Sequence, residues 1–325
     1  MRYHAIALSA SIALGFGVPA LAQDAYPSKP ITIIVPAAAG GPSDTVARLV
    51  AQSMSTTLGQ QVLVENQGGA GGSLGSGTAA RATPDGYTLL LYHVGVATFA
   101  ALYADLPYDP ADDLDSVGLI TEVPLTLVGR QDLPAENVEQ LLGSLREQGD
   151  QFTFGTAGVG AVSDLCGMLL SDALDTEMVV VPYQGTGPAM TDLLGGQIDV
   201  MCDQTTNTAA NIERGAIKGF AVTTRERVPL FPDLPTLAES GLEGFEITAW
   251  HALWAPAGTP EEIRTQLSEA LKTALQDQTV IDRFAQLGTV PVAQDQATPS
   301  ALDTLFQSEI ERWSQLIANV ERPAQ

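Results

Sequence analysis

Short apolar runs alternate with amphipathic segments along nearly the whole chain. Apolar runs bounded by turn residues predict strands, and apolar residues spaced three or four apart predict helices. The expected strands are 31–35, 61–65, 88–92, 117–128, 152–154, 178–181, 198–201 and 219–222. The expected helices are 43–58, 73–81, 96–103, 137–148, 162–173, 186–194, 206–214 and 300–319, with one more opening at Pro260. This alternation predicts βαβ units, mostly parallel sheets and an α/β fold class.

Two extended apolar stretches are too long to be ordinary loops. They cover residues 117–130 and 247–260, and a self-contained α/β block lies between them. A domain inserted into another and joined to it by two connecting strands is the arrangement of a two-lobed binding protein. We therefore expect lobe 1 to comprise residues 23–125 and 250–325, lobe 2 to comprise 126–249, and a ligand cleft to separate them.

The first 22 residues have the pattern of a signal peptide. Arg2 supplies a positive start, residues 5–18 are apolar, and Ala20-Leu21-Ala22 is a small-x-small cleavage site. We expect cleavage after Ala22 and export to the periplasm. No later stretch reaches the roughly 18 consecutive apolar residues that a membrane-spanning helix needs.

The charge of the chain excludes some partners. Its 15 Lys and Arg residues face 38 Asp and Glu residues, a formal net charge of −23. Such a surface repels nucleic acid and anionic membranes, so neither is an expected partner. An anionic ligand would have to be held by local groups that overcome this field.

Three loops share one design, in which an apolar strand leads through small residues into a helix. They read "PAAAGGPSD" (36–44), "FGTAGVGAVSD" (154–164) and "VPYQGTG" (181–187). Helix N-termini carry unpaired N–H groups and a partial positive charge, and small residues let a ligand reach them. One such loop in each lobe predicts a clamp for the anionic end of a ligand.

The polar residues of the first two loops have simpler structural roles as well. Ser43 or Asp44, and Ser163 or Asp164, are expected to cap the helices that they begin. Arg48 lies four residues after Asp44, which is the spacing of a helical ion pair.

An enzymatic alternative rests on "GGSLG" (71–75), which matches the G-x-S-x-G pattern of α/β hydrolases. In a secreted serine esterase Ser73 would be the nucleophile, and His251 follows it in hydrolase order. The nucleophile of that family directly follows its strand, whereas residues 67–72 separate Ser73 from the strand here. Ser73 is therefore expected to cap a helix or to donate a hydrogen bond in the cleft, and we expect no enzymatic activity.

The remaining candidate chemistry is sparse. His93 and His251 are the only histidines after the signal peptide, and no cysteine pair has zinc spacing, so no metal or cofactor is expected. His93 follows a predicted strand and is a candidate to face the cleft. Cys166 and Cys202 either form a disulfide, as an oxidising compartment permits, or are two buried small apolar residues.

The chain resembles the Bug family, the periplasmic solute receptors of tripartite tricarboxylate transporters. The resemblance covers nearly the whole mature chain and rests on "YPSKPITIIVPAAAGGPSDTVAR", "VENQGGAGGSLGS", "ATPDGYTLLL", "LPYDPADDL", "VPYQGTGPAMTDLLGGQIDVMCD", "FPDLPTLAESGLEGFEITAW" and "WAPAGTP" in that order. It implies a type II periplasmic binding protein, monomeric, which closes two α/β lobes on a small carboxylate and delivers it to a membrane permease.

The resemblance also implies which residues bind the ligand. In lobe 1 these are Ala38, Ala39, Gly40, Gly41 and Ser43, with Ser73 and His93 nearby; in lobe 2 they are Thr156, Ala157, Gly158, Ser163 and Asp203. The chain departs from the family pattern at Ala37, Asp164 and Cys202. These departures concern the part of the pocket that holds the far end of the ligand, whereas the clamp for one carboxylate is retained.

Overall fold

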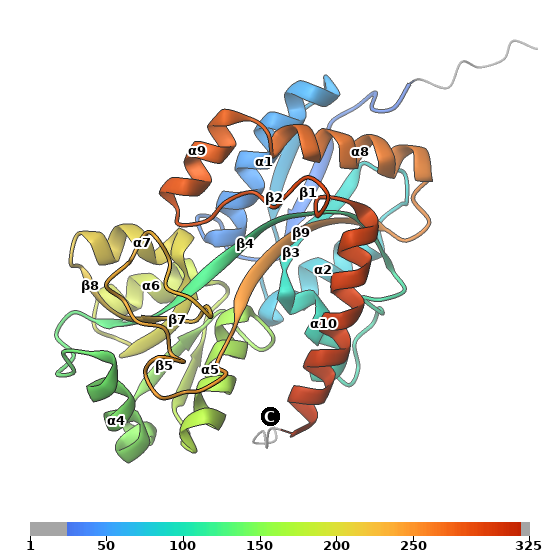
Figure 1. The fold of residues 1–325 in the computed structure, drawn as a ribbon. Coiled ribbons are helices and arrows are strands. Elements are labelled where there is room, and N and C mark those ends of the chain that lie inside the picture. Colours follow the sequence, from blue (N-terminus) through green and yellow to red (C-terminus); the bar gives the residue numbers. More distant parts are fainter. Residues whose placement is uncertain (1–24, 320–325) are drawn as a thin grey trace, which may run out of the picture.

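Two α/β lobes share a nine-stranded sheet in the computed structural model (Figure 1). The structure describes residues 25–319, so the predicted signal peptide lies outside the described residues. The strands are β1 Ile31–Val35, β2 Val62–Asn66, β3 Thr88–His93, β4 Leu114–Arg130, β5 Thr153–Thr156, β6 Val179–Pro182, β7 Val200–Gln204, β8 Ile217–Val222 and β9 Thr248–Pro256.

Helices connect these strands and cover the sheet. They are α1 Pro42–Leu58, α2 Ser73–Ala80, α3 Phe99–Leu102, α4 Val138–Gln148, α5 Val162–Leu174, α6 Thr186–Leu194, α7 Thr205–Glu213, α8 Glu261–Ala274, α9 Gln278–Gln286 and α10 Pro299–Asn319. Three short 3₁₀ helices span Ala70–Gly72, Val94–Thr98 and Gly149–Gln151.

The strand order is β2-β1-β3-β9-β4-β7-β5-β6, and β8 also pairs with β4. The strands that alternate with helices pair in parallel, as the sequence predicted: β1 with β2 and β3, and β5 with β6 and β7. The long strands β4 and β9 pair antiparallel with their neighbours, so the sheet is mixed rather than mostly parallel as predicted. We call the part around β1–β3 and β9 lobe 1, and the part around β5–β8 lobe 2.

Strand β4 runs through both lobes. Its residues from Leu114 to Pro124 pair with β9, and those from Leu125 to Gly129 pair with β7. The apolar stretch predicted as a connection is therefore one continuous strand of 17 residues. In Figure 1 it crosses from the upper lobe to the lower one beside β9. The two-lobed α/β fold is confirmed, while the boundaries at residues 125 and 249 stay predictions.

One predicted helix differs from the structure. Instead of a helix over 96–103, the chain forms a 3₁₀ helix at Val94–Thr98 and then the short α3. The Thr98 hydroxyl donates to the Gly95 carbonyl at 2.8 Å, a local bond that competes with regular α-helical pairing.

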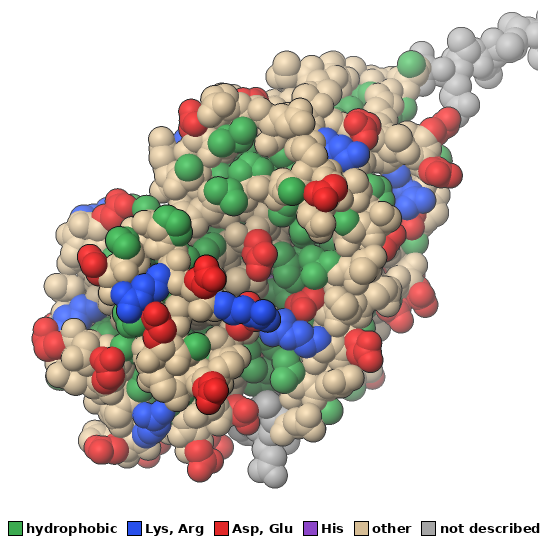
Figure 2. Space-filling view, viewed as in Figure 1, with side chains coloured by type: hydrophobic (Ala, Val, Ile, Leu, Met, Phe, Trp, Pro, Cys, Tyr) green, Lys and Arg blue, Asp and Glu red, His purple; other side chains and the backbone are tan. Residues whose placement is uncertain are grey.

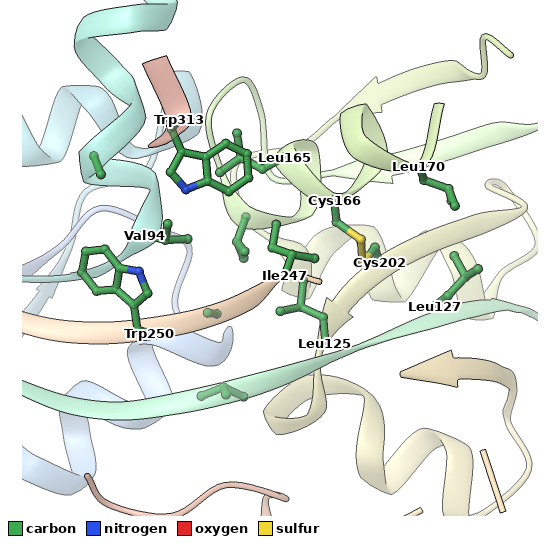
Figure 3. Packing of buried hydrophobic residues seen from close by; sticks show 14 of the residues in the cluster. Val94, Leu125, Leu127, Leu165, Cys166, Leu170, Cys202, Ile247, Trp250 and Trp313 are labelled. Carbon is green, nitrogen blue, oxygen red and sulfur yellow. A yellow bond between two sulfur atoms is a disulfide. The ribbon is translucent and has the colours of Figure 1, made fainter. Parts of the chain in front are cut away.

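Apolar side chains pack across the junction of the two lobes (Figure 3). Trp250 of β9 and Trp313 of α10 are buried there, together with Leu125 of β4. A disulfide joins Cys166 of α5 to Cys202 of β7, with their Cα atoms 6.2 Å apart. Of the two alternatives left open by the sequence, the disulfide is confirmed, and both cysteines are also fully buried.

Candidate ligand-binding site

A small cavity lies between the lobes, where the parallel strands of each lobe end. Its volume is about 20 Å³, roughly the space of one water molecule, so the lobes are closely shut. Ligands of open α/β sheets bind at such carboxyl ends. The lining comes from both lobes: Ala37, Ala38, Gly41, Pro42, Ser43, Tyr92, His93, Ala157, Ala161, Val162, Ser163, Gly185, Thr186 and Gln204.

Three helices begin at this cavity. Pro42, Val162 and Thr186 are the first residues of α1, α5 and α6, and all three line it. Helix N-termini carry unpaired N–H groups and the positive ends of the helix dipoles, and three of them border this cavity. No Lys or Arg is among the lining residues, and acidic side chains are spread over the outer face of both lobes in Figure 2. Any attraction of an anion to this cavity would therefore have to come from backbone N–H groups and helix dipoles rather than from cationic side chains.

The first two loops are closed by an aspartate in the same way. The N–H of Gly40 donates to Asp44 Oδ2 at 2.9 Å, and the N–H of Gly160 donates to Asp164 Oδ2 at 3.0 Å. The expected helix caps are wrong for both Ser–Asp pairs. The capping positions are residues 41 and 161, without a side-chain cap, because the helices begin one residue before each serine.

The predicted ion pair between Asp44 and Arg48 is confirmed, with Arg48 Nη2 2.9 Å from Asp44 Oδ1. Partial burial raises the pKa of Asp44, but hydrogen bonds from Arg48 and from the Gly40 N–H outweigh it and hold this pKa below its ordinary value. The carboxylate is therefore ionised at neutral pH, and its charge is directed at groups of its own loop rather than at the cavity.

Ser43 and Ser163, at corresponding positions of the first two loops, also have corresponding hydrogen bonds. Ser163 Oγ accepts a hydrogen bond from the Ala157 N–H at 2.9 Å. Ser43 Oγ lies 3.1 Å from Nε2 of His251, which comes from β9. Both serines are buried and both line the cavity. Each lobe thus supplies one hydroxyl whose oxygen already has a partner in the protein.

The two histidines, far apart in sequence, lie side by side in the structure. His93 of β3 is directly opposite His251 of β9, and their ring centres are 5.8 Å apart. Burial lowers the pKa of His251 to about 3 and that of His93 well below its ordinary value, so both rings are neutral at pH 7. His93 Nδ1 accepts the Gly95 N–H at 3.1 Å, which leaves its proton on Nε2 as a donor.

The closed lobes meet through their backbones. The N–H of Ala38 in lobe 1 donates to the carbonyl of Gln184 in lobe 2 at 3.1 Å. A Cβ atom on Gly71 would lie 1.8 Å from the Val159 carbonyl oxygen, and one on Gly68 would lie 2.9 Å from that of Gln184. Glycine is therefore required where the stretch 68–72 meets lobe 2, a role that the sequence pattern did not reveal.

The structure brings half of the predicted ligand-binding residues to the cavity. These are Ala38, Gly41, Ser43, His93, Ala157 and Ser163. Gly158 lines a neighbouring groove where the two lobes meet. Gly71 and Tyr103 line the same groove. Ala39, Gly40, Ser73 and Thr156 are outside the lining, and so is Asp203.

Asp203 is fully buried, and its Oδ2 accepts a hydrogen bond from Asn207 at 2.6 Å. Its neighbour Gln204 lines the cavity in its place. Residues of the third loop, Gly185 and Thr186, also line it, and the repeated strand–glycine–helix pattern was the signal for them. Nothing in the sequence singled out Tyr92 or Gln204.

Residues 25–319 contain neither a candidate metal site nor a candidate membrane-spanning helix. No three His, Cys, Asp or Glu side chains lie together in a way that could hold a metal ion. No helix in this part of the chain has both the length and the apolar character needed to span a bilayer.

Comparison with known proteins identifies a family. A sequence model described as the tripartite tricarboxylate transporter family receptor matches residues 46–321. A protein of Agrobacterium vitis, named after the TAR-I ttuE-ttuC' intergenic region, is 62% identical over 319 residues, which are 98% of this chain and 91% of that protein.

Solved structures of similar proteins agree with this match. The periplasmic binding protein BugD is 45% identical with a TM-score of 0.89, over 92% of this chain and 100% of its own. MatC from Rhodopseudomonas palustris with bound malate is 39% identical with a TM-score of 0.87, over 90% and 100% of the two chains. Another R. palustris protein, with adipate, is 30% identical with a TM-score of 0.85, over 91% and 99%.

Proposed function

We infer that this chain, which belongs to the tripartite tricarboxylate transporter family of receptors, captures a small carboxylate between its lobes and delivers it to a membrane permease. The observation that carries the proposal is the meeting of three helix N-termini from both lobes at one cavity without a Lys or Arg. Such a site attracts an anion through N–H groups and helix dipoles. The N–H groups of Ser43 and Ser163, in the first turns of α1 and α5, are the proposed donors to the carboxylate.

The proposed ligand is a small dicarboxylate. MatC holds malate and its R. palustris relative holds adipate, and both share this fold over nearly the whole chain. One carboxylate would lie between the loops of the two lobes, with Gly41 and Ala157 leaving room for it. The other end would face the side chains of His93 and Gln204, which are polar but uncharged at neutral pH.

The protein is proposed to act in the periplasm as a monomer, after cleavage of the signal peptide at Ala22. The lobes would open and close on β4 and β9, near the predicted boundaries at residues 125 and 249. Opening is needed for ligand entry, because a cavity of about 20 Å³ is smaller than any dicarboxylate.

The proposed role does not include catalysis. The hydrogen bond of His251 goes to Ser43, whereas Ser73 is buried at the start of α2 and its carbonyl accepts the Tyr108 hydroxyl at 3.0 Å. An assay with activated esters tests the esterase alternative. We expect no turnover, and turnover that Ser73→Ala abolishes would establish the esterase instead.

Binding is tested with the mature chain in a thermal-shift screen of mono-, di- and tricarboxylates, followed by calorimetry on the hits. A ligand at one hundred times its Kd adds about 2.7 kcal/mol to the free energy of unfolding. Small-angle scattering should then show a smaller radius of gyration with ligand than without. Folded protein that binds none of the carboxylates at millimolar concentration would overturn the proposal.

A further inference from the structure

His251 is the one polar side chain from the connecting strand β9 that reaches a loop of the proposed site. Its Nε2 lies 3.1 Å from Ser43 Oγ, and both side chains are buried. Ser43 lines the cavity, whereas His251 does not. His251 can therefore act on a ligand only through a neighbour that lines the cavity, and its hydrogen bond is to Ser43.

The position of the single proton on the His251 ring sets the direction of its hydrogen bond with the serine. The buried ring is neutral at pH 7 and so carries a single N–H group. Nδ1 of His251 makes no hydrogen bond of good geometry with a described residue, although the backbone of Ala249 lies near enough to raise the pKa of the ring against the effect of burial. A buried N–H group without an acceptor is costly, and a proton on Nε2 has Ser43 Oγ as its acceptor. A proton on Nε2 makes the ring the donor to Ser43 Oγ, whereas a proton on Nδ1 would leave Nε2 to accept the serine hydroxyl.

This hydrogen bond determines what Ser43 offers to the cavity. A hydroxyl that already accepts one hydrogen bond still has its own proton to donate. The corresponding serine in lobe 2, Ser163, already accepts one hydrogen bond through its Oγ, from the Ala157 N–H at 2.9 Å. Its own hydroxyl proton is therefore still available for donation. In one loop a backbone group occupies the serine oxygen, and in the other the Nε2–H of His251 would do so.

We propose that His251 is a positioning residue for carboxylate recognition, which holds the Ser43 hydroxyl as a hydrogen-bond donor towards the ligand. The proposal rests on the proposed function and adds a residue from outside the loops to it. Without His251 the hydroxyl could turn to a backbone carbonyl of its own helix, as serines in helices do, and the ligand would lose this donor.

A double-mutant cycle tests whether the two residues act together. Calorimetry with malate and with adipate would compare wild type, Ser43→Ala, His251→Leu and the double variant. Each single change removes a hydrogen bond to the charged carboxylate or the group that positions it, so each should raise Kd about tenfold or more. We expect the double variant to bind as Ser43→Ala does. Combining His251→Leu with Ser163→Ala is the matched control, in which the two losses should multiply.

Conservative variants separate positioning from packing. His251→Gln places an amide N–H near the position of Nε2 and should bring Kd back to within about threefold of wild type. His251→Asn is polar too, but its shorter side chain does not reach Ser43 and should not restore binding. Melting temperatures of all variants show that each is folded. Losses that multiply in the Ser43 double variant, or equal affinities of the Gln and Asn variants, would overturn the proposal.

A measurement without ligand keeps this proposal separate from the proposed function. After removal of the signal peptide, His93 and His251 are the only histidines, so their ¹⁵N imidazole signals are easily assigned with His251→Leu. We expect His251 to be protonated on Nε2. Protonation on Nδ1 would overturn the positioning role even if the protein binds carboxylates. If the protein binds no carboxylate, the proposed function is refuted, but the position of the His251 proton can still be measured.

Discussion

Asp44 and Asp164 have the same place in two different lobes. Each accepts a hydrogen bond from the N–H of the glycine four residues before it, at 2.9 Å for Asp44 and 3.0 Å for Asp164. Both loops border the cavity between the lobes. A negative side chain close to a proposed anion site is thus directed at its own loop, and its role is to give that loop its shape.

Replacing Asp44 should therefore weaken binding more than replacing its cationic partner. Asp44→Ala leaves the Gly40 N–H without its acceptor, which costs about 1–3 kcal/mol and loosens the loop, so we expect Kd to rise about tenfold. Arg48 is half exposed and outside the cavity lining. Arg48→Ala removes a surface pair worth at most about 1 kcal/mol and should change Kd by less than about threefold. Calorimetry with the screened carboxylate decides, and loss of binding in Arg48→Ala alone would show that a salt bridge holds the anion.

A methyl group added where lobe 1 contacts lobe 2 should oppose closure of the two lobes. In Gly68→Ala the new Cβ would lie 2.9 Å from the Gln184 carbonyl oxygen of the other lobe. A contact of this kind costs roughly 1–3 kcal/mol in the closed state only, so Kd should rise about tenfold while the ligand-free protein keeps its melting temperature. Gly143→Ala is the matched control, because Gly143 lies in α4 with no atom within 4 Å of its would-be Cβ. It should stabilise the protein by about 0.5–1 kcal/mol without changing Kd. Unchanged affinity in Gly68→Ala would mean that this contact between the lobes does not form around the ligand.

Stability should depend on pH through Asp203. Burial raises the pKa of this carboxyl from its ordinary 3.8 to about 6. The folded state then holds the proton more tightly than the unfolded chain, so stability falls as pH rises from about 4 to about 6, by up to about 3 kcal/mol. Asp203→Asn lacks this titration. Urea unfolding of both proteins between pH 4 and pH 7.5 should show wild type losing stability relative to the variant, and a constant difference would contradict the raised pKa of the buried Asp203 carboxyl.

The disulfide should stabilise the fold with little effect on binding. Cys166 and Cys202 are 36 residues apart in sequence, and closing such a loop is worth about 3–4 kcal/mol. We expect the Cys166→Ala/Cys202→Ala variant to melt several degrees lower than wild type. A thiol reductant should lower the melting temperature of wild type and leave that of the variant unchanged. Because neither cysteine lines the cavity, Kd should stay within about threefold of wild type.

The sequence could predict those parts of the structure that depend on residues close together in the chain. Strand–loop–helix units such as that of 31–58 follow from apolar spacing, small residues and a helix start, all within a short stretch. The pairing of Asp44 with Arg48 follows from helix geometry alone. The caps were missed because Pro42 and Val162 take the first helical positions, which moves each Ser–Asp pair one step into its helix.

The contacts that the sequence could not predict depend on how strands far apart in the sequence pair with each other. Ser43 and His251 are 208 residues apart, and they meet only because β9 returns beside β3 in one particular register. A shift of one residue would turn His251 to the opposite face of the sheet. The contact between the lobes is equally hidden, since the need for glycine at Gly71 comes from the Val159 carbonyl of the other lobe. No local pattern carries information about either contact.

The continuity of β4 also affects how the protein can come apart. Hydrogen bonds of this strand belong to the lobe 1 sheet up to Pro124 and to the lobe 2 sheet from Leu125 onward. Unfolding one lobe would leave part of β4 without a partner and expose its buried side chains, which adds to the cost for the other lobe. The chain thus couples the stabilities of two sheets through one backbone segment. Heat should melt this receptor in a single cooperative transition rather than lobe by lobe.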